Sequence, residues 1–153
     1  MNALPLSSAA MLLAASILPA PLAATPSKQP ATYDAGWLTW CINARGGTTL
    51  ADARCYVEHR EALVARQGVL LKKIEATLSI KGPDGTDYAK AARALSASQK
   101  AWEAFMSADC DLVDNVSGFY GTAVGLAGED CLITHYLARN AALASLQQDY
   151  LDQ

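Results

Sequence analysis

Carboxylates are the side chains of this sequence with the clearest chemical potential. They crowd the C-terminal half of the chain as Asp109, Asp111, Asp114, Glu129 and Asp130. A carboxylate pair can serve as general acid and base, as in glycoside hydrolysis, but this spacing does not match an EF-hand calcium loop. The chain also has no GxSxG, HExxH, phosphate-binding glycine loop or dinucleotide fingerprint. We therefore predict no enzyme activity, no cofactor and no metal site, with a hydrolase that uses the acidic cluster as a distant alternative.

Four cysteines form the second group of reactive side chains. An even number in a short exported chain suggests two disulfides, and three pairings are possible. We favour Cys41–Cys55 with Cys110–Cys131, because the partners are close in sequence and flank one expected helix–helix connection each. Each bond would stabilise the fold by about 3 kcal/mol in the chain-entropy description. A zinc site is the alternative, but no CxxC motif supports it.

The histidines and tryptophans carry no sign of a ligand site. His59 and His135 are far apart in the sequence, and we expect both to be ordinary surface or half-buried residues. Trp37, Trp40 and Trp102 are expected in the core rather than on a ligand platform.

Charge is distributed unevenly along the chain, although the net charge is only −3. Residues 25–100 carry 11 Lys or Arg against 7 Asp or Glu, whereas residues 101–153 carry 1 against 8. If Cys110 and Cys131 are bonded, the acids beside them gather at one end of the fold. Such a patch can attract a basic partner, and a solvated rim without a partner is the equal alternative. The dispersed basic residues argue against nucleic-acid binding.

The first 24 residues predict export. They hold no charged residue, and an apolar run from Met11 to Leu18 is followed by prolines and by Ala23-Ala24. This pattern is typical of a cleavable signal peptide, and the run is too short and proline-interrupted for a comfortable membrane anchor, which is the alternative. We predict a signal peptide at 1–24, a flexible leader at 25–35, one domain at 36–153 and a periplasmic or secreted location.

The apolar spacing predicts the elements that must position these side chains. A short helix is expected around Trp37 to Asn43, followed by long helices over about 50–79, 88–112 and from Glu129-Asp130 onward. Thr48 or Thr49 is expected to cap the second helix. Residues 115–128 are expected to form a glycine-rich loop. The fold class is therefore all-α, a small bundle of three long helices plus a short N-terminal helix, held by two local disulfides.

The C-terminal half resembles a known family of small exported bacterial domains. Its motifs are Leu95-x-x-x-Gln99-x-x-Trp102, then Cys110, a loop with Gly121-Thr122, Cys131-x-x-Thr134, and Arg139 with Leu143. This arrangement resembles the LprI-like lysozyme inhibitor family over residues 95–146, and the upstream cysteine pair is similar to that family's first pair. The resemblance implies a periplasmic protein with two local disulfides that inhibits lysozyme-type muramidases.

The resemblance and the charge pattern together give a predicted partner-binding surface. Its residues are Asp109, Asp111, Asp114, Phe119, Tyr120, Glu129 and Asp130. The carboxylates would steer a basic protein such as lysozyme, and one aromatic side chain of the loop would anchor it; the alternative makes both aromatics a lid over the bundle.

The other motif residues are expected to have structural roles. Trp102 would fill the core, Gln99 would bond the loop backbone, and Thr134 and Arg139 are carried over from the family pattern. An envelope scaffold or stress protein with an unknown partner is the alternative function. No stable membrane insertion is expected after signal cleavage.

Overall fold

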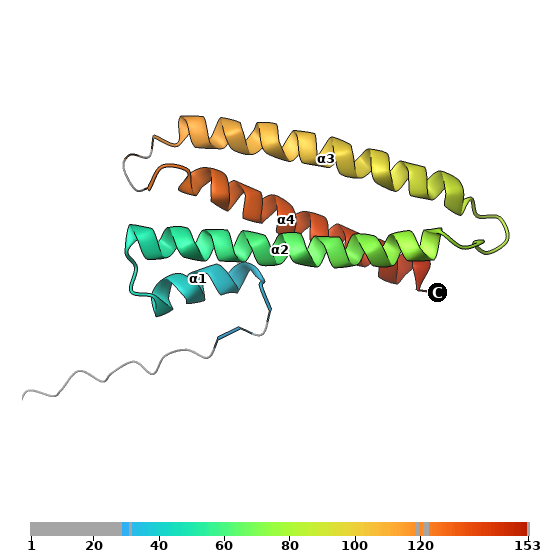
Figure 1. Cartoon of the computed structure of the whole chain (residues 1–153), viewed down its shortest axis with the longest axis horizontal. Coiled ribbons are helices and arrows are strands. Elements are labelled where there is room, and N and C mark those ends of the chain that lie inside the picture. Colours follow the sequence, from blue (N-terminus) through green and yellow to red (C-terminus); the bar gives the residue numbers. More distant parts are fainter. Residues whose placement is uncertain (1–28, 31, 119, 121–122, 153) are drawn as a thin grey trace, which may run out of the picture.

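The structure, a computed structural model, describes residues 29–30, 32–118, 120 and 123–152 and contains only helices and their connections within that part of the chain (Figure 1). The predicted signal peptide at 1–24 lies outside the described residues. The helices are α1 (Ala35–Ala44), α2 (Thr49–Leu78), α3 (Tyr88–Val116) and α4 (Leu126–Leu146), with a short π-helix, η2 (Gln147–Leu151), at the end. The predicted all-α bundle of three long helices and one short helix is confirmed.

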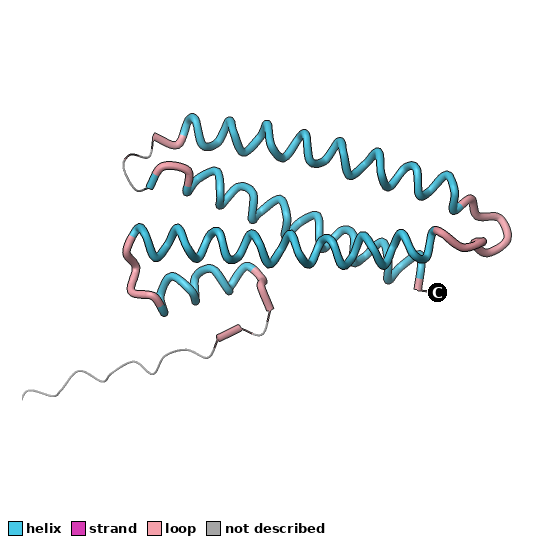
Figure 2. The backbone as a smooth tube through the Cα atoms, viewed as in Figure 1, coloured by secondary structure: helices cyan, strands magenta, loops and turns pink. Residues whose placement is uncertain are grey.

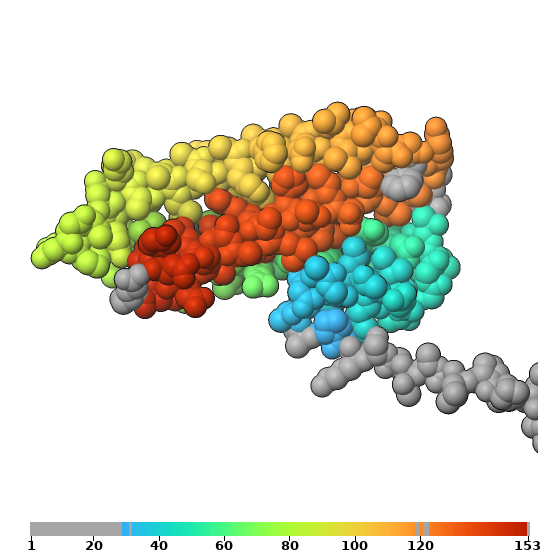
Figure 3. Space-filling view, turned by 180° about the vertical axis from the view of Figure 1, so that it is seen from behind, coloured from blue at the N-terminus to red at the C-terminus, as the bar shows by residue number. Residues whose placement is uncertain are grey.

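Helix α4 is the central element of the bundle. It packs against both α2 and α3, which contact each other much less, and α1 lies along the first half of α2. Seen from behind, α4 runs between α3 and the α1–α2 pair (Figure 3). The connections lie at the two ends of the bundle (Figure 2). None of the described helices is long and apolar enough to cross a membrane.

Short polar side chains begin the first three helices. The carboxylate of Asp34 accepts from the Gly36 amide at 2.9 Å, and the Thr48 hydroxyl accepts from the Ala51 amide at 3.3 Å. Asp87 accepts from Lys90 in the same way at 2.8 Å. These bonds satisfy amide groups that have no partner inside the helix, and they confirm Thr48 as the cap of α2.

Two boundaries differ from the sequence-based expectation. Helix α3 continues through Asn115 to Val116, and α4 begins at Leu126 rather than at Glu129-Asp130. The expected glycine-rich loop at 115–128 is therefore wrong at both ends, and only residues 117–125 connect the two helices. Glycine lowers helix propensity but does not forbid a helix that is packed against a neighbour.

The apolar core has two centres, separated by polar side chains. Trp37 packs against the Cys41–Cys55 pair at one end, and Ile74, Leu78, Leu95 and Leu143 pack at the other. The polar layer between them is defined by Gln67, Gln99, Arg139 and Asn140, which come from α2, α3 and α4.

Hydrogen bonds inside the polar layer link all three long helices. Gln99 Nε2 donates to Gln67 Oε1 at 3.1 Å, and Asn140 Nδ2 donates to the Leu63 carbonyl at 3.0 Å. Buried polar groups cost free energy unless they are paired. A shift of one helix along another would break these pairs, so the layer favours a single register.

Part of the expected leader is packed onto the fold. The ring of Tyr33 lies 4.7 Å from that of Trp37, and the Tyr33 carbonyl lies 3.3 Å from Nε2 of His59. His59 is completely buried, which corrects the expectation of a surface or half-buried residue. Burial lowers the pKa of the His59 imidazole, although its bond to the Tyr33 carbonyl and the charge of Asp34 act in the opposite direction.

The buried neutral imidazole predicts a loss of stability in acid. Above the ordinary histidine pKa of 6.5 both folded and unfolded chains hold His59 neutral. Below it the unfolded chain takes up a proton that the folded chain resists, so the free energy of unfolding should fall from that pH down to the lowered pKa. The measurement is urea unfolding between pH 7.5 and pH 5. His59→Gln should be less stable at neutral pH but should lose the part of the pH dependence that begins near 6.5; an unchanged pH dependence in this variant would contradict the assignment.

Candidate functional site

Three helix ends meet at one end of the bundle. Helix α2 begins there, α3 ends there and α4 begins there (Figure 1). The acids at these helix ends are Asp52, Asp109, Asp111, Asp114, Glu129 and Asp130, and we call this region the acidic end. The gathering of the C-terminal carboxylates expected from a Cys110–Cys131 bond is thus present, with Asp52 of α2 added to it.

The Cys110–Cys131 disulfide holds α3 and α4 together beside the acidic end. The Cα atoms of the two cysteines are 5.5 Å apart, and the other predicted bond, Cys41–Cys55, is also formed. Both predicted pairings are therefore confirmed. Cys110 lies within two turns of the end of α3, and Cys131 within two turns of the start of α4, so the bond fixes how the two termini face each other.

A close helix contact replaces the missing cap of α4. Gly125 precedes the first residue of α4 and provides no side-chain cap. Its φ of +83° lies in the left-handed region, which favours glycine. One carboxylate oxygen of Asp114, on α3, instead accepts from the Gly128 amide at 3.4 Å. A Cβ atom at Gly128 would lie 3.2 Å from the Asp114 side chain, so glycine allows this approach. The negative charge of Asp114 also suits the positive end of α4.

Two of the predicted partner-binding acids are paired within the protein. Arg60 Nε of α2 donates to Glu129 at 2.7 Å, and both side chains are largely buried. Nε2 of His135 lies 2.8 Å from an oxygen of Asp109. The structure places Asp109 and Glu129 at the acidic end. Arg60 of α2 offsets the charge of Glu129, and the imidazole of His135 on α4 contacts Asp109.

Asp111 and Asp130 remain exposed, and their carboxylates make no ion pair with any described residue. Near Asp130, burial raises the pKa of the Tyr56 phenol, and the charges of Asp130 and Asp52 raise it further. The phenol of Tyr56 and the carboxylates of Asp52 and Asp130 therefore lie close together where α2 and α4 begin.

A pocket of about 320 Å³ opens between α3 and α4 beside the disulfide. Its apolar wall includes Met106 and Leu132, and its polar wall carries Asp111, Asp114 and Glu129. An apolar wall with carboxylates at the rim suits a long cationic side chain, because the methylenes contact the wall while the charged head meets the acids.

Exposed apolar side chains surround the acidic end. Leu112 and Val116 lie one turn apart on α3 and are 60% and 72% exposed, and Val124 in the connection is 64% exposed. Tyr120 is 87% exposed, so the alternative in which it closes over the bundle as a lid is wrong. Phe119, the other predicted anchor, and Gly121-Thr122 lie outside the described residues.

Gln99 joins helices rather than the loop. Its amide donates to Gln67 and Glu103, each at 3.1 Å, and its oxygen accepts from Arg139 at 3.2 Å. The expected bond to the loop backbone is wrong, because Gln99 lies nearly five turns from the end of α3, about 25 Å along the axis.

Trp102 and Thr134 also differ from the simplest expectation. Trp102 is half-buried rather than inside the core, with its ring edge-on to Tyr136 at 5.3 Å and the Arg139 guanidinium 5.8 Å away. Thr134 is exposed, and its hydroxyl donates to the Asp130 carbonyl of the same helix at 3.0 Å. Trp102 therefore stabilises the α3–α4 contact from its edge, and Thr134 acts locally.

One cluster in the described residues has the composition of a metal site. The sulfurs of Cys110 and Cys131 and a ring nitrogen of His135 all lie within 4.8 Å of one another. The two sulfurs are bonded to each other, so neither is a thiolate that could bind a cation. In the oxidised protein the cluster is a disulfide beside a histidine–aspartate pair.

The family comparison matches the part of the chain that carries these features. A model of the lysozyme inhibitor LprI family matches residues 41–143, which run from the first cysteine to the last core leucine of α4. The chain belongs to the LprI family. No curated protein and no solved structure shows a significant match. The resemblance seen in the C-terminal motifs is thereby confirmed, and the LprI match extends upstream to include the end of α1 and all of α2.

The site residues that sequence reasoning missed come from α2. Asp52, Tyr56 and Arg60 lie at the acidic end although at least 69 residues of sequence separate them from Glu129 of α4. Their spacing of four residues places them on one face of α2, which was the available signal. The facing helix could not be identified from that spacing.

The close approach of Asp114 to Gly128 predicts that an alanine at position 128 destabilises the protein, although alanine normally stabilises a helix relative to glycine. Gly128→Ala places a methyl group against Asp114 and should displace its bond to α4, so we expect a loss of about 1 kcal/mol in the free energy of unfolding. Gly68→Ala is the matched control, because Gly68 lies inside α2 with open space around it and should gain about 0.5–1 kcal/mol. Chemical denaturation measures both. Equal stabilisation by the two substitutions would show that the Asp114 contact is not tight.

Proposed function

We propose that the protein is an exported inhibitor of lysozyme-type muramidases and that it binds them with the acidic end. Membership of the lysozyme inhibitor LprI family supports the target class. The observation that carries the proposal is the pocket beside the Cys110–Cys131 bond, with three carboxylates at its rim and exposed apolar side chains around it.

The charge of the acidic end suits a basic target. Many lysozymes are strongly basic, and complementary charge raises the association rate and fixes orientation. Because Asp109 and Glu129 are paired internally, the steering charge is assigned to Asp111 and Asp130. Asp114 and the rim of the pocket would receive an arginine or lysine side chain of the target, where a charge-assisted hydrogen bond is stronger than a neutral one.

The apolar anchor of the interface is assigned to Tyr120 with Leu112 and Val116. Exposed aromatic side chains commonly dominate binding energy when a partner buries them. The disulfide fixes the ends of α3 and α4 that carry these side chains, so less conformational entropy is lost when the target binds this end of the bundle. Inhibition requires only that this end of the bundle obstruct the substrate cleft, and no catalytic step is assigned to the inhibitor.

The first test is lysozyme activity on cell-wall substrate with the purified oxidised protein at low and at physiological salt. Asp111→Lys with Asp130→Lys should weaken inhibition by roughly tenfold or more and should flatten its salt dependence. Asp84→Lys is the matched control, because Asp84 is exposed in the turn at the other end of the bundle. Absence of inhibition at large molar excess against several lysozymes would refute the proposal and favour an envelope scaffold with another partner.

The second test separates the apolar anchor from charge. Tyr120→Ala should raise the inhibition constant by roughly tenfold at any salt concentration, because it removes buried contact area rather than charge. Tyr150→Ala is its control, since Tyr150 is 71% exposed in η2 at the other end. Inhibition assays together with circular dichroism check both variants. If they inhibit equally, Tyr120 lies outside the interface.

A further inference from the structure

A second hollow lies in the half of the bundle away from the acidic end. It is a groove of about 350 Å³ where α2 ends, α3 begins and α4 ends. Its apolar wall includes Leu78, Leu95, Leu143, Leu146 and Leu151. This volume is within the range of small-molecule sites, which are concave, mostly apolar and carry a few polar groups.

The groove exists because the facing helices carry alanines. Ala91 and Ala94 on α3 and Ala142 on α4 line it. A methyl group at these positions leaves space that a leucine would fill, whereas well-packed cores leave few voids larger than a water molecule. The alanines therefore leave an apolar groove between α3 and α4, which are joined elsewhere by the polar layer and the Cys110–Cys131 bond.

A polar pair closes one end of the groove. Arg139 and Ser98 both line it, and Nη2 of Arg139 donates to the Ser98 hydroxyl at 3.2 Å. Nε and Nη2 of Arg139 also donate to Gln99, which holds the guanidinium in place. Among the described residues Nη1 has no acceptor, and the Ser98 hydroxyl keeps its own proton to donate.

The Arg139 guanidinium forms no direct ion pair with a described carboxylate. Arg139 is half-buried, and it is the only Lys or Arg in residues 101–153. A partly buried cation loses hydration and is stabilised by an anionic partner. The groove thus offers a positive charge and two donor groups at one end, with an apolar channel beyond them.

We propose that this groove binds a free fatty acid of medium chain length, with its carboxylate on Arg139 and Ser98 and its alkyl chain along the leucines. The guanidinium favours a planar carboxylate, and removal of the alkyl chain from water adds to the affinity with each methylene that is buried. The volume admits one chain rather than a two-chain lipid. This site is remote from the acidic end and does not depend on lysozyme inhibition.

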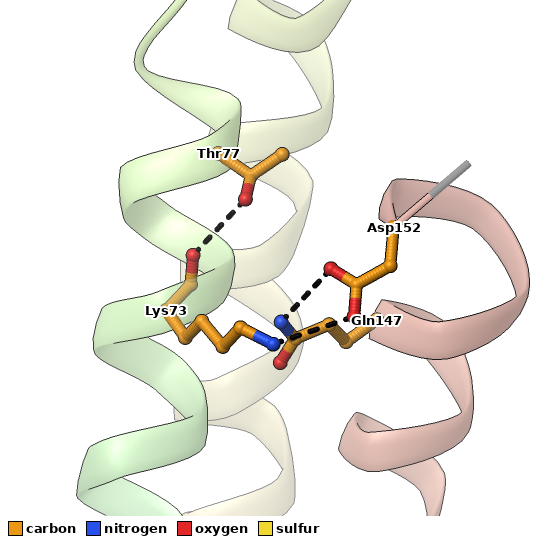
Figure 4. A network of polar contacts seen from close by, with 4 residues as sticks. All are labelled: Lys73, Thr77, Gln147 and Asp152. Carbon is orange, nitrogen blue, oxygen red and sulfur yellow. Dashed lines mark hydrogen bonds and ion pairs between the residues drawn. The ribbon is translucent and has the colours of Figure 1, made fainter.

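The C-terminal segment forms the outer wall of the groove. Leu151 belongs to η2, and η2 is fastened to α2 by Lys73, whose ammonium lies 3.3 Å from Asp152. The Gln147 amide donates to the other oxygen of Asp152 at 3.2 Å (Figure 4). These bonds lower the pKa of the Asp152 carboxyl, with the Gln147 bond the larger cause. They position the apolar side chain of Leu151 over the groove.

The test is isothermal titration of the oxidised protein with three ten-carbon amphiphiles below their micelle concentrations. Decanoate should bind saturably at one per chain, and 1-decanol and decyltrimethylammonium should bind roughly tenfold more weakly or not at all. Methyl shifts in NMR spectra should centre on Ala94, Ala142 and Leu143. Equal affinity for all three amphiphiles, or no saturable binding of decanoate, would overturn the proposal.

Substitutions at Ala94, Ala97 and Arg139 distinguish a specific site from non-specific hydrophobic binding. Ala94→Leu should fill the groove and abolish binding, while Ala97→Leu, on the same helix but not lining the groove, should bind as the parent does.

Arg139→Gln should lower decanoate affinity by roughly tenfold or more and leave 1-decanol binding unchanged, with Arg139→Lys intermediate. Unchanged decanoate binding in folded Ala94→Leu would overturn the assignment. Lysozyme inhibition by Ala94→Leu should remain intact, which keeps the two proposals separable.

Discussion

The Cys110–Cys131 bond is the constraint on which the arrangement of the acidic end depends. It holds the end of α3 and the start of α4 with Cα atoms 5.5 Å apart, and this closeness lets Asp114 cap α4 at Gly128. Several carboxylates would repel one another if the two helix ends were free. The covalent link keeps them together, and the positive end of α4 and Arg60 offset part of their charge.

The polar layer in the middle of the bundle divides the molecule into two halves with different chemistry. Gln67, Gln99, Arg139 and Asn140 hydrogen-bond between helices, so α4 has one register between α2 and α3. On one side of the layer lie both disulfides and the acidic end. On the other lie the leucine core, the alanine-lined groove and the C-terminal segment. A protein of this size can therefore present two independent surfaces.

The internal pairing of charges changes how the acidic end should be understood. Counting carboxylates along the sequence gives a strong negative patch, but Asp109, Asp114 and Glu129 have partners within the protein. Asp111, Asp114 and Asp130 form no ion pair with a described residue, and Asp111 and Asp114 line the pocket. Exposed apolar side chains lie at the same end of the bundle. Charge at the rim with apolar area in the middle is the arrangement expected of a protein-binding surface.

The sequence alone determined the helices, the pairing of the cysteines and the family. These features follow from local properties of the sequence: the apolar spacing, the Thr48 cap and the short separation of each cysteine pair. A short stretch of sequence is therefore sufficient to predict them. It did not give the ends of α3 and α4, because helix contacts there outweigh the low propensity of glycine and asparagine. The lid alternative for Tyr120, the core position of Trp102 and the loop contact of Gln99 were wrong because each depends on tertiary contacts, which a local sequence pattern does not specify.

Only the tertiary structure decided which charges are free and where the groove lies. Arg60 pairs with Glu129 across 69 residues of sequence, and Arg139 reaches Gln99 across 40. Such contacts depend on which face of one helix meets which face of another. Helical periodicity defines the faces of each helix, but the packing of α4 between α2 and α3 selects the faces that meet.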